Sequence, residues 1–393
     1  FQLQYLVDSA GCARFSYNWA LTEWKKRWEK QKKLPKVRRK YISDHDLRKH
    51  LNAIKRSEYP FLLNVSKYVS QEAIKQLGVA FKNFFKGRAN YPTYRKRFVD
   101  DRFTIGNDHI QVKGNRVRLP KIGWIKMREA IRFHGSVQTV SISRQADRWF
   151  ISFGVKVDDH TPYFKQHAEN QGEVVGLDAG LTSLAVLSNG ETFEGPKSLR
   201  KGLKRLKQLQ RSLARKERGS KKRQRAKMRV AKQHRRIANI RKDALHKLTA
   251  SVTDRFKTIV VEKLNVKGMM KNVKLARSLA DASFFEMKRQ LIYKAKLRGG
   301  QVIEAPQFFA SSKLCSCCGW KNQELKLSDR SWTCRECKTT HDRDINAAVN
   351  LRHYAVSYTV KASGEESSGL VALRRNKAKL ASKKGETGPS YLS

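Results

Sequence analysis

The stretch VVGLDAGL, residues 174–181, indicates the fold of the C-terminal half of the chain. An apolar run ends at Asp178, and small turn-forming residues follow it. A short apolar run bounded by turn residues is typical of a strand buried on both faces. A second apolar run at 184–187 predicts a neighbouring strand, and Asn189-Gly190 predicts a turn into a third. An ionised carboxylate ending a buried strand is costly unless it binds a cation, so Asp178 is the first candidate site residue.

Two further acidic residues occupy comparable positions. Glu262 ends the apolar run 259–261, and Asp344 lies at the start of a predicted helix that continues to Leu351. Single acidic residues at such ends are common as caps, but three in a strongly basic chain favour a shared metal site. Two Mg²⁺ ions about 3.5–4 Å apart can activate water and stabilise the leaving oxygen in phosphodiester cleavage. Spacing alone leaves caps and a metal site as equal alternatives.

The charge indicates a polyanionic partner. The 393 residues contain 84 Lys and Arg against 34 Asp and Glu, a formal net charge of +50. Nucleic acid is the natural counter-charge, because each neutralised phosphate also releases condensed counterions. A ribosomal-type protein or a binder of anionic membranes is the alternative. The basic segment from Leu199 to Leu248 predicts an antiparallel pair of helices with a phosphate-facing surface.

Five of the six cysteines lie close together. They form two CxxC pairs separated by 15 residues, which is within the range of a zinc ribbon. We expect one structural Zn²⁺, with Cys317 pointing away from it and Cys12 buried as a small apolar residue. The expected zinc ligands are Cys315, Cys318, Cys334 and Cys337.

The N-terminal half mixes helical and strand patterns. Apolar residues recur at helical spacing up to about residue 90, mostly as expected core. Alternating patterns at 110–119 and 140–155 then predict antiparallel hairpins in a small barrel. Residues 158–172 look like a linker, and the end of the chain like a disordered tail. No apolar run is long enough to cross a bilayer. No signal-peptide pattern is present, although a few N-terminal residues are expected to be missing. We therefore expect no membrane partner and a cytoplasmic, nucleoid-associated protein.

Four motifs, in this order, resemble the TnpB proteins of bacterial insertion sequences: GLDAGL at 176–181, VEKLNVKGM at 261–269, the double CxxC preceded by Ser311-Ser312, and HDRDINAA at 341–348. The resemblance extends over most of the chain, with GCARFSYN at 11–18, NFF at 83–85 and LPKIGW at 119–124.

The resemblance implies a multi-domain α/β fold: a RuvC (RNase H-like) nuclease domain with an inserted zinc ribbon, and an N-terminal β-barrel (wedge) domain with a helical recognition insertion. The implied boundaries are 1–9 and 91–165 for the wedge barrel, 10–90 for the helical recognition domain, 172–365 for the RuvC-like domain, 310–340 for the ribbon and 366–393 for a disordered tail.

The resemblance also implies the activity. Members of the family are RNA-guided DNA endonucleases that bind a guide RNA from the transposon end, read a short adjacent motif and cut double-stranded DNA. Asp178, Glu262 and Asp344 would hold catalytic Mg²⁺, two ions being expected, and Asp342 is the less favoured ligand. Candidates for reading the adjacent motif are Lys67, Tyr68, Gln71 and Thr104. The alternatives are a compact type V CRISPR effector, an RNA-guided binder or regulator that does not cleave, and a structural RNA-binding protein.

Overall fold

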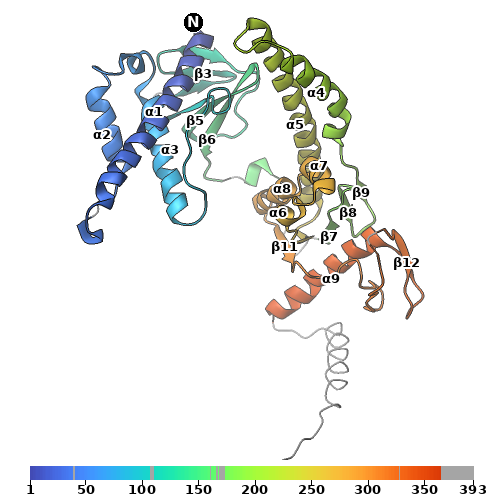
Figure 1. The fold of residues 1–393 in the computed structure, drawn as a ribbon. Helices are drawn as coiled ribbons and strands as arrows, with labels where there is room; N and C mark the ends of the chain where they lie inside the picture. The colour runs from blue at the N-terminus through green and yellow to red at the C-terminus, as the bar shows by residue number, and fades with distance from the viewer. Residues whose placement is uncertain are drawn as a thin grey trace, which may run out of the picture. The chain divides into compact units, whose positions relative to one another are not determined.

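The chain forms two compact units, Phe1–Asp159 and His160–Ser393, in a computed structural model (Figure 1). The structure describes residues 1–38, 40–106, 110–159, 161–164, 167, 173–326 and 328–363. The predicted tail, 366–393, and much of the predicted linker lie outside the described residues. Within the described part, no helix combines the length and apolar character needed to cross a membrane.

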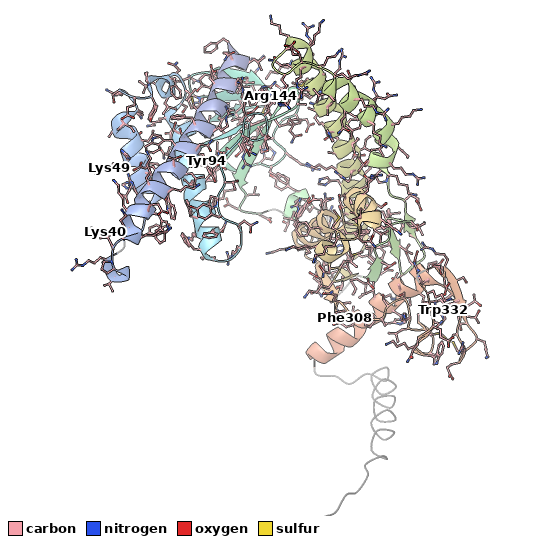
Figure 2. All side chains as sticks on the ribbon, in the orientation of Figure 1. Lys40, Lys49, Tyr94, Arg144, Phe308 and Trp332 are labelled. Atoms are coloured by element: carbon pink, nitrogen blue, oxygen red, sulfur yellow. The ribbon has the colours of Figure 1, made fainter. Side chains whose placement is uncertain are left out.

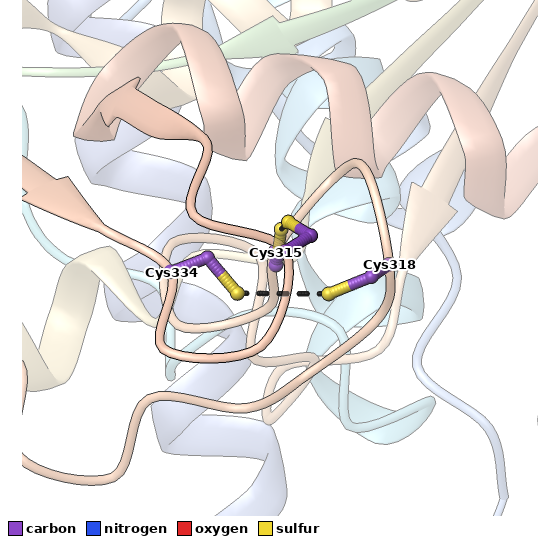
Figure 3. A group of neighbouring side chains, drawn as sticks. Cys315, Cys318 and Cys334 are labelled. Carbon is purple, nitrogen blue, oxygen red and sulfur yellow. Dashed lines mark hydrogen bonds between the residues drawn. The ribbon is translucent and has the colours of Figure 1, made fainter.

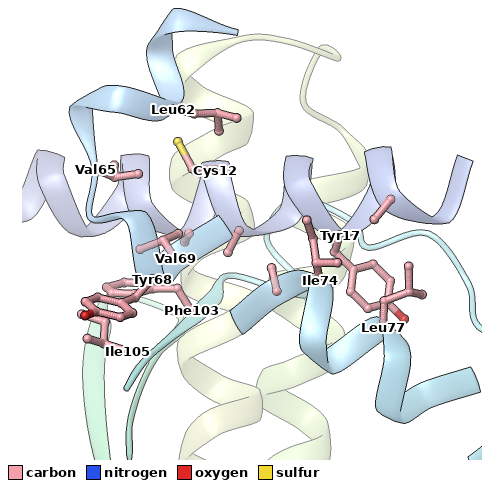
Figure 4. Packing of buried hydrophobic residues seen from close by; sticks show 14 of the residues in the cluster. Cys12, Tyr17, Leu62, Val65, Tyr68, Val69, Ile74, Leu77, Phe103 and Ile105 are labelled. Atoms are coloured by element: carbon pink, nitrogen blue, oxygen red, sulfur yellow. The ribbon is translucent and has the colours of Figure 1, made fainter. Parts of the chain in front are cut away.

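Three helices build one side of the first unit. They are α1 (Gln2–Lys32), α2 (Asp44–Ile54) and α3 (Lys67–Phe85), with 3₁₀ turns η1 (Lys36–Arg38) and η2 (Pro60–Asn64) between them. The Ser43 hydroxyl caps α2 by accepting a hydrogen bond from the Asp46 amide at 3.1 Å. Helices α1 and α3 pack along each other (Figure 4), and the rings of Trp24 and Phe81 stack with centroids 4.0 Å apart. The N-terminal aromatics therefore serve mainly as core, as predicted.

The first unit also contains two antiparallel sheets. One pairs β1 (Arg102–Gly106), β5 (Ser136–Gln145) and β6 (Arg148–Lys156); the other pairs β2 (Gln111–Lys113), β3 (Arg116–Leu119) and β4 (Gly123–Lys126). Both predicted hairpins, β2–β3 and β5–β6, are confirmed. The described strands form two separate three-stranded sheets, and no pairing among them closes a single barrel.

The resemblance assigns residues 1–9 to the wedge barrel, but they do not form a barrel strand. Gln2–Lys32 is one continuous helix, which runs through Gly11 without a break. Its first turns reach the sheet as a helix: the Tyr5 hydroxyl donates to the carbonyl of Pro120 at 3.0 Å. Helices and strands share one apolar core, so 10–90 and 91–159 fold as one compact unit.

The second unit is built on a five-stranded sheet in the order β11-β10-β7-β8-β9. Strands β7 (Val174–Asp178), β10 (Thr258–Glu262) and β11 (Gln301–Ala305) are parallel, whereas β8 (Ala185–Leu187) and β9 (Thr192–Phe193) are antiparallel to their neighbours. The apolar runs that form β7, β8 and β10, and the turn into β9, were predicted from the sequence.

Helices cover both faces of this sheet. The predicted hairpin is α4 (Ser198–Ala214) and α5 (Lys221–Arg255); α6 (Val266–Met269), α7 (Val273–Ala282) and α8 (Phe284–Leu297) follow β10. Helices α5 and α8 share a core with one face of the sheet, and α9 (Arg343–Ser363) shares a core with the other. Strands β12 (Ser331–Thr333) and β13 (Thr340–Asp342) belong to the cysteine-containing segment between β11 and α9.

Gly176 permits the close packing of α9 on β7. A β-carbon at this position would lie 1.8 Å from the Ala348 carbonyl oxygen and 2.7 Å from the Arg352 amide nitrogen. Because both contacts are with backbone atoms, any side chain here must displace the helix. Gly176 therefore fixes the approach of the helix that carries Asp344.

We expect Gly176→Val to lower the free energy of unfolding by about 3 kcal/mol or more, because the added side chain overpacks the β7–α9 contact. Urea unfolding of the purified variant measures the change. Gly195→Ala is the matched control: its β-carbon would meet only the Leu184 side chain at 3.6 Å, so a change below about 1 kcal/mol is expected. Equal stabilities of the Gly176→Val variant and the unmodified chain would contradict this packing argument.

Candidate metal centres

The strand register brings two of the predicted acidic residues together. Val261 of β10 is the register partner of Leu177 of β7, so Glu262 and Asp178 are the next residues along two adjacent parallel strands. Neighbouring strands lie about 4.8 Å apart, and both side chains fall at the carboxyl-terminal edge of the sheet. Residues 84 positions apart in the chain therefore meet at one edge.

Asp344 joins them from the first turn of α9. Burial, followed by the charges of Glu262 and Asp344, raises the pKa of Asp178 to about 7. A carboxyl that is buried and near other negative charges has a raised pKa, because its ionised form is disfavoured. The strand register places Asp178 beside Glu262; a shared metal site for Asp178, Glu262 and Asp344 stays a prediction.

Polar side chains contact two of the three carboxylates. Glu262 accepts a short hydrogen bond from the Ser311 hydroxyl. Asp344 accepts from Arg343 at 3.0 Å and from Arg330 at 3.3 Å. The oxygens of the three carboxylates are not all within 4.8 Å of one another. Among the possible metal-binding groups of the described residues, only the sulfur atoms of the four-cysteine cluster are that close together. In this structure Asp344 is paired with both arginines.

Asp342 has a different role. Its Oδ1 accepts from the amides of Asp344 at 3.0 Å and Ile345 at 2.9 Å. This is the hydrogen-bonding pattern of a helix N-cap. A carboxylate used in this way orients the first turn of α9, which agrees with the choice of Asp344 over Asp342.

Sequence reasoning missed a polar clamp beside the carboxylates. Asn346 and Asn350, one turn apart on α9 and both buried, donate to the Leu314 carbonyl, each at 2.7 Å. Asn350 also donates to the carbonyl of Ser311 at 2.7 Å. The segment 311–315, which carries both the partner of Glu262 and the first cysteine, is therefore fixed to the helix that carries Asp344. The sequence signal for these contacts is the spacing of the two asparagines, which lie four residues apart and therefore on the same face of the helix.

The predicted zinc ligands form a second centre. The sulfur atoms of Cys315, Cys318, Cys334 and Cys337 all lie within 4.8 Å of one another. Cys315 and Cys337 are 3.6 Å apart, as are Cys318 and Cys334, the pair joined by the dashed line in Figure 3. Sulfurs about 2.3 Å from a tetrahedral Zn²⁺ would have similar spacings, so the donor set fits zinc.

The surroundings of the cluster support a structural site. The Nε2 atom of His341 lies 3.0 Å from the Cys315 sulfur. A hydrogen bond from this position can hold the sulfur in the orientation needed to bind a metal. Cys317 is exposed and outside the cluster, and Cys12 is buried in the first unit, both as predicted. The four-cysteine cluster indicates one structural zinc ion.

The four candidate motif-reading residues differ in how accessible their side chains are. Tyr68 is 8% exposed and belongs to the core of the first unit, which favours packing over contact with a base. Thr104 is half-buried and shares hydrogen bonds with Gln76 at 2.9 Å and Ser141 at 3.1 Å. Lys67 is exposed and Gln71 half-buried on the first turns of α3. Their role in reading DNA stays a prediction, with Lys67 and Gln71 the more accessible.

The helical hairpin presents a strongly basic surface. Between residues 198 and 242 the only acidic residue is Glu217. Leu206 and Ile237 are buried between the two helices, while nitrogen-tipped side chains project outward from α4 and α5 in Figure 2. A single-sign surface of this kind suits a nucleic-acid backbone.

Comparison with known proteins agrees with this arrangement. Residues 152–273 match a family described as probable transposase, residues 284–351 match the Cas12f1-like TNB domain, and residues 2–33, which lie mostly in α1, match a helix-turn-helix domain. The "Putative RNA-guided DNA endonuclease InsQ" of Escherichia coli (strain K12) is 35% identical over 91% of this chain and 89% of its own length.

The chain belongs to the TnpB family. A second relative, a "Putative RNA-guided DNA endonuclease" of Streptomyces pristinaespiralis, is also 35% identical, over 89% of this chain and 85% of its own. Among solved structures, a Cas12f1–sgRNA–target DNA complex contains a similar chain, with a TM-score of 0.53 at 14% identity, covering 89% of this chain and 82% of that one. The TNB match covers all four clustered cysteines and Asp344. The TnpB resemblance predicted from the motifs is confirmed by the two relatives at 35% identity and by the transposase family match.

Proposed function

We propose that this TnpB-family chain is an RNA-guided DNA endonuclease that hydrolyses phosphodiester bonds with Mg²⁺ held by Asp178, Glu262 and Asp344. The observation that carries the proposal is the register of β7 and β10, which sets Asp178 and Glu262 side by side where α9 begins with Asp344. The relatives named as RNA-guided DNA endonucleases match across both units, which supports the same activity here.

We further propose that the second unit is a RuvC-like nuclease domain. An RNase H-like sheet has three antiparallel strands followed by two strands parallel to the first, and the order β11-β10-β7-β8-β9 agrees with this. In this assignment the first unit supplies the wedge and recognition functions, and Lys67 and Gln71 are its accessible candidates for contacting the adjacent motif.

The residues of the site have separate tasks. Bound Mg²⁺ would supply an activated water and would neutralise charge on the leaving oxygen. Asp178 would have to lose its proton and Asp344 its contacts with Arg330 and Arg343 in order to hold the metal, and Ser311 orients the carboxylate of Glu262 by its hydrogen bond. The clamp formed by Asn346 and Asn350 keeps these groups in register with the ribbon.

Guide pairing would read the target sequence, and the protein would hold the RNA–DNA duplex through its backbone. The basic surface of α4 and α5 supports this division, because phosphate contacts need charge more than base-specific geometry. A compact type V CRISPR effector would share these features, but 35% identity to the InsQ relative over 91% of this chain favours the insertion-sequence protein. A binder without cleavage would have no use for three converging carboxylates.

Sequencing of the RNA that co-purifies with the protein tests the proposal. We expect a discrete transcript from the transposon end, and the isolated complex should cut a duplex that matches the guide when Mg²⁺ is added. A heterogeneous RNA population together with no guide-dependent cutting would contradict the proposed function.

We expect the Mg²⁺ concentration for half-maximal cleavage to rise by up to about tenfold for each pH unit below 7, because a proton and the metal compete for Asp178. The pKa of Asp178 is raised to about 7, so the carboxyl is protonated below that pH and ionised above it. Without metal, the folded chain binds this proton in a pH range where the unfolded chain has lost it. Stability then falls as pH rises from about 4 to about 7. Mg²⁺ titrations of the cleavage rate on both sides of pH 7 measure the effect, and a constant half-maximal concentration would refute it.

A further inference from the structure

We propose that the groove between α4 and α7 binds the backbone of the single DNA strand that enters the catalytic site. The inference rests on the proposed endonuclease function and names the path of its substrate. The groove has a volume of about 550 Å³ and lies within the second unit. Its walls come from the loop after β7, the start of α4 and the whole length of α7.

Cations without counter-ions line this groove. Arg200, Lys274 and Arg277 are exposed, and none of them has an ion-pair partner among the residues that the structure describes. Lys197 is only loosely paired, with Glu194 at 3.9 Å. Positive charges gathered at one hollow and left unpaired repel one another, and an anion bound between them would relieve this repulsion.

The one carboxylate in the lining is already engaged. Asp281 accepts from the Ser198 hydroxyl at 2.9 Å and from the Leu199 amide at 3.0 Å, and lies 3.7 Å from Arg241. It therefore caps the N-terminus of α4 and does not neutralise the exposed cations across the groove. The net charge that the groove offers to a ligand is positive.

The floor of the groove is apolar, which favours a single strand. Leu181, Leu184, Leu199 and Leu203 line it, and Val273 at its rim is 89% exposed. A duplex presents phosphates and hides the faces of its bases, whereas an unpaired strand exposes both phosphates and bases. Basic walls over an apolar floor match the second kind of ligand.

The position of the groove favours the DNA strand to be cut over the guide RNA. Gly180 and Leu181 line the groove and are the second and third residues after Asp178. A strand that lies along α7 therefore runs towards the loop beside the carboxylates. The guide RNA, which pairs with the target strand, would instead contact the larger basic surface of α4 and α5.

Crosslinking tests the location directly. A complex with guide RNA and target duplex, prepared without Mg²⁺, would carry 4-thiothymidine in the displaced strand and be irradiated. We expect the crosslinked peptide to come from residues 273–282. This readout needs no cleavage, so it separates the inference from the proposed activity. Crosslinks of these residues to the guide RNA, or none to the DNA, would overturn the groove assignment.

The double variant Lys274→Ala with Arg277→Ala tests the contribution of the cations. We expect guide binding and melting temperature to be unchanged and single-turnover cleavage to fall about tenfold. In a plot of the logarithm of the cleavage rate against the logarithm of the salt concentration, the slope should become less steep by up to about 1.4. This is the change expected for the loss of two phosphate contacts on a single strand. The matched control is Lys271→Ala with Lys296→Ala, which removes the same charge outside the groove lining and should cleave normally. Equal rates for the two double variants, or loss of guide binding in the first, would disprove the proposed contact.

Discussion

Asp178→Asn is expected to abolish guide-dependent DNA cleavage while guide RNA binding persists. Asparagine keeps the size of the side chain but removes the charge that would bind Mg²⁺, and Asp178 is central, since both Glu262 and Asp344 interact with it electrostatically. Loss of a metal ligand should cost at least about 4 kcal/mol of transition-state stabilisation, roughly a thousandfold in rate. Single-turnover cleavage of a guide-matched duplex, with RNA binding measured in parallel, gives both quantities.

Asp342→Asn is the matched control for this substitution. It removes one negative charge from the same region, but an asparagine can still accept hydrogen bonds from the Asp344 and Ile345 amides at the start of α9. We expect less than about a tenfold change in rate. If Asp342→Asn were inactive and Asp178→Asn retained cleavage, the assignment of the carboxylates would be wrong.

Cys334→Ser is expected to remove zinc and to unfold the ribbon. The cluster would lose one of four thiolates, and the apolar cluster of this segment is small, comprising Cys315, Leu325, Trp332 and Cys334 with a few partly buried neighbours. Such a small core folds only with a staple such as a metal. Metal analysis should show a fall from about one zinc ion per chain to nearly none, with a lower melting temperature.

Cys317→Ser separates loss of a ligand from loss of any cysteine. Cys317 lies between two cluster residues, yet it is exposed and outside the cluster. Zinc content and melting temperature should match those of the unmodified chain. Zinc retained in full by Cys334→Ser, or lost in Cys317→Ser, would rule out the ligand set.

The ribbon and the carboxylates are structurally connected, so the zinc variant should also cleave more slowly. Asn346 and Asn350 bind the segment that leads to Cys315, and Ser311 in this segment donates to Glu262. Disorder in the ribbon would free Ser311 and weaken the hold on that carboxylate. The connection explains why a structural metal and a candidate catalytic centre occupy the same unit.

Predictions from local pattern succeeded where the pattern alone decides the structure. The buried strands at 174–178 and 258–262, the basic helical hairpin and the zinc cysteines all follow from periodicity or spacing. The first nine residues show the limit of a boundary taken from a resemblance. They were assigned to the barrel, but they form the first turns of the continuous helix α1.

The sequence by itself determined which residues could do chemistry: three acidic residues at the ends of apolar segments, four cysteines at zinc spacing and an excess of positive charge. The tertiary structure decided which of them meet. Parallel pairing of β7 and β10 places Asp178 beside Glu262, and the absence of a side chain at Gly176 lets α9, the helix that begins with Arg343 and Asp344, pack closely on β7. The groove between α4 and α7 likewise arises only when distant segments pack together. Periodicity and spacing are local properties of a chain, whereas strand register and helix approach depend on contacts between residues far apart in sequence.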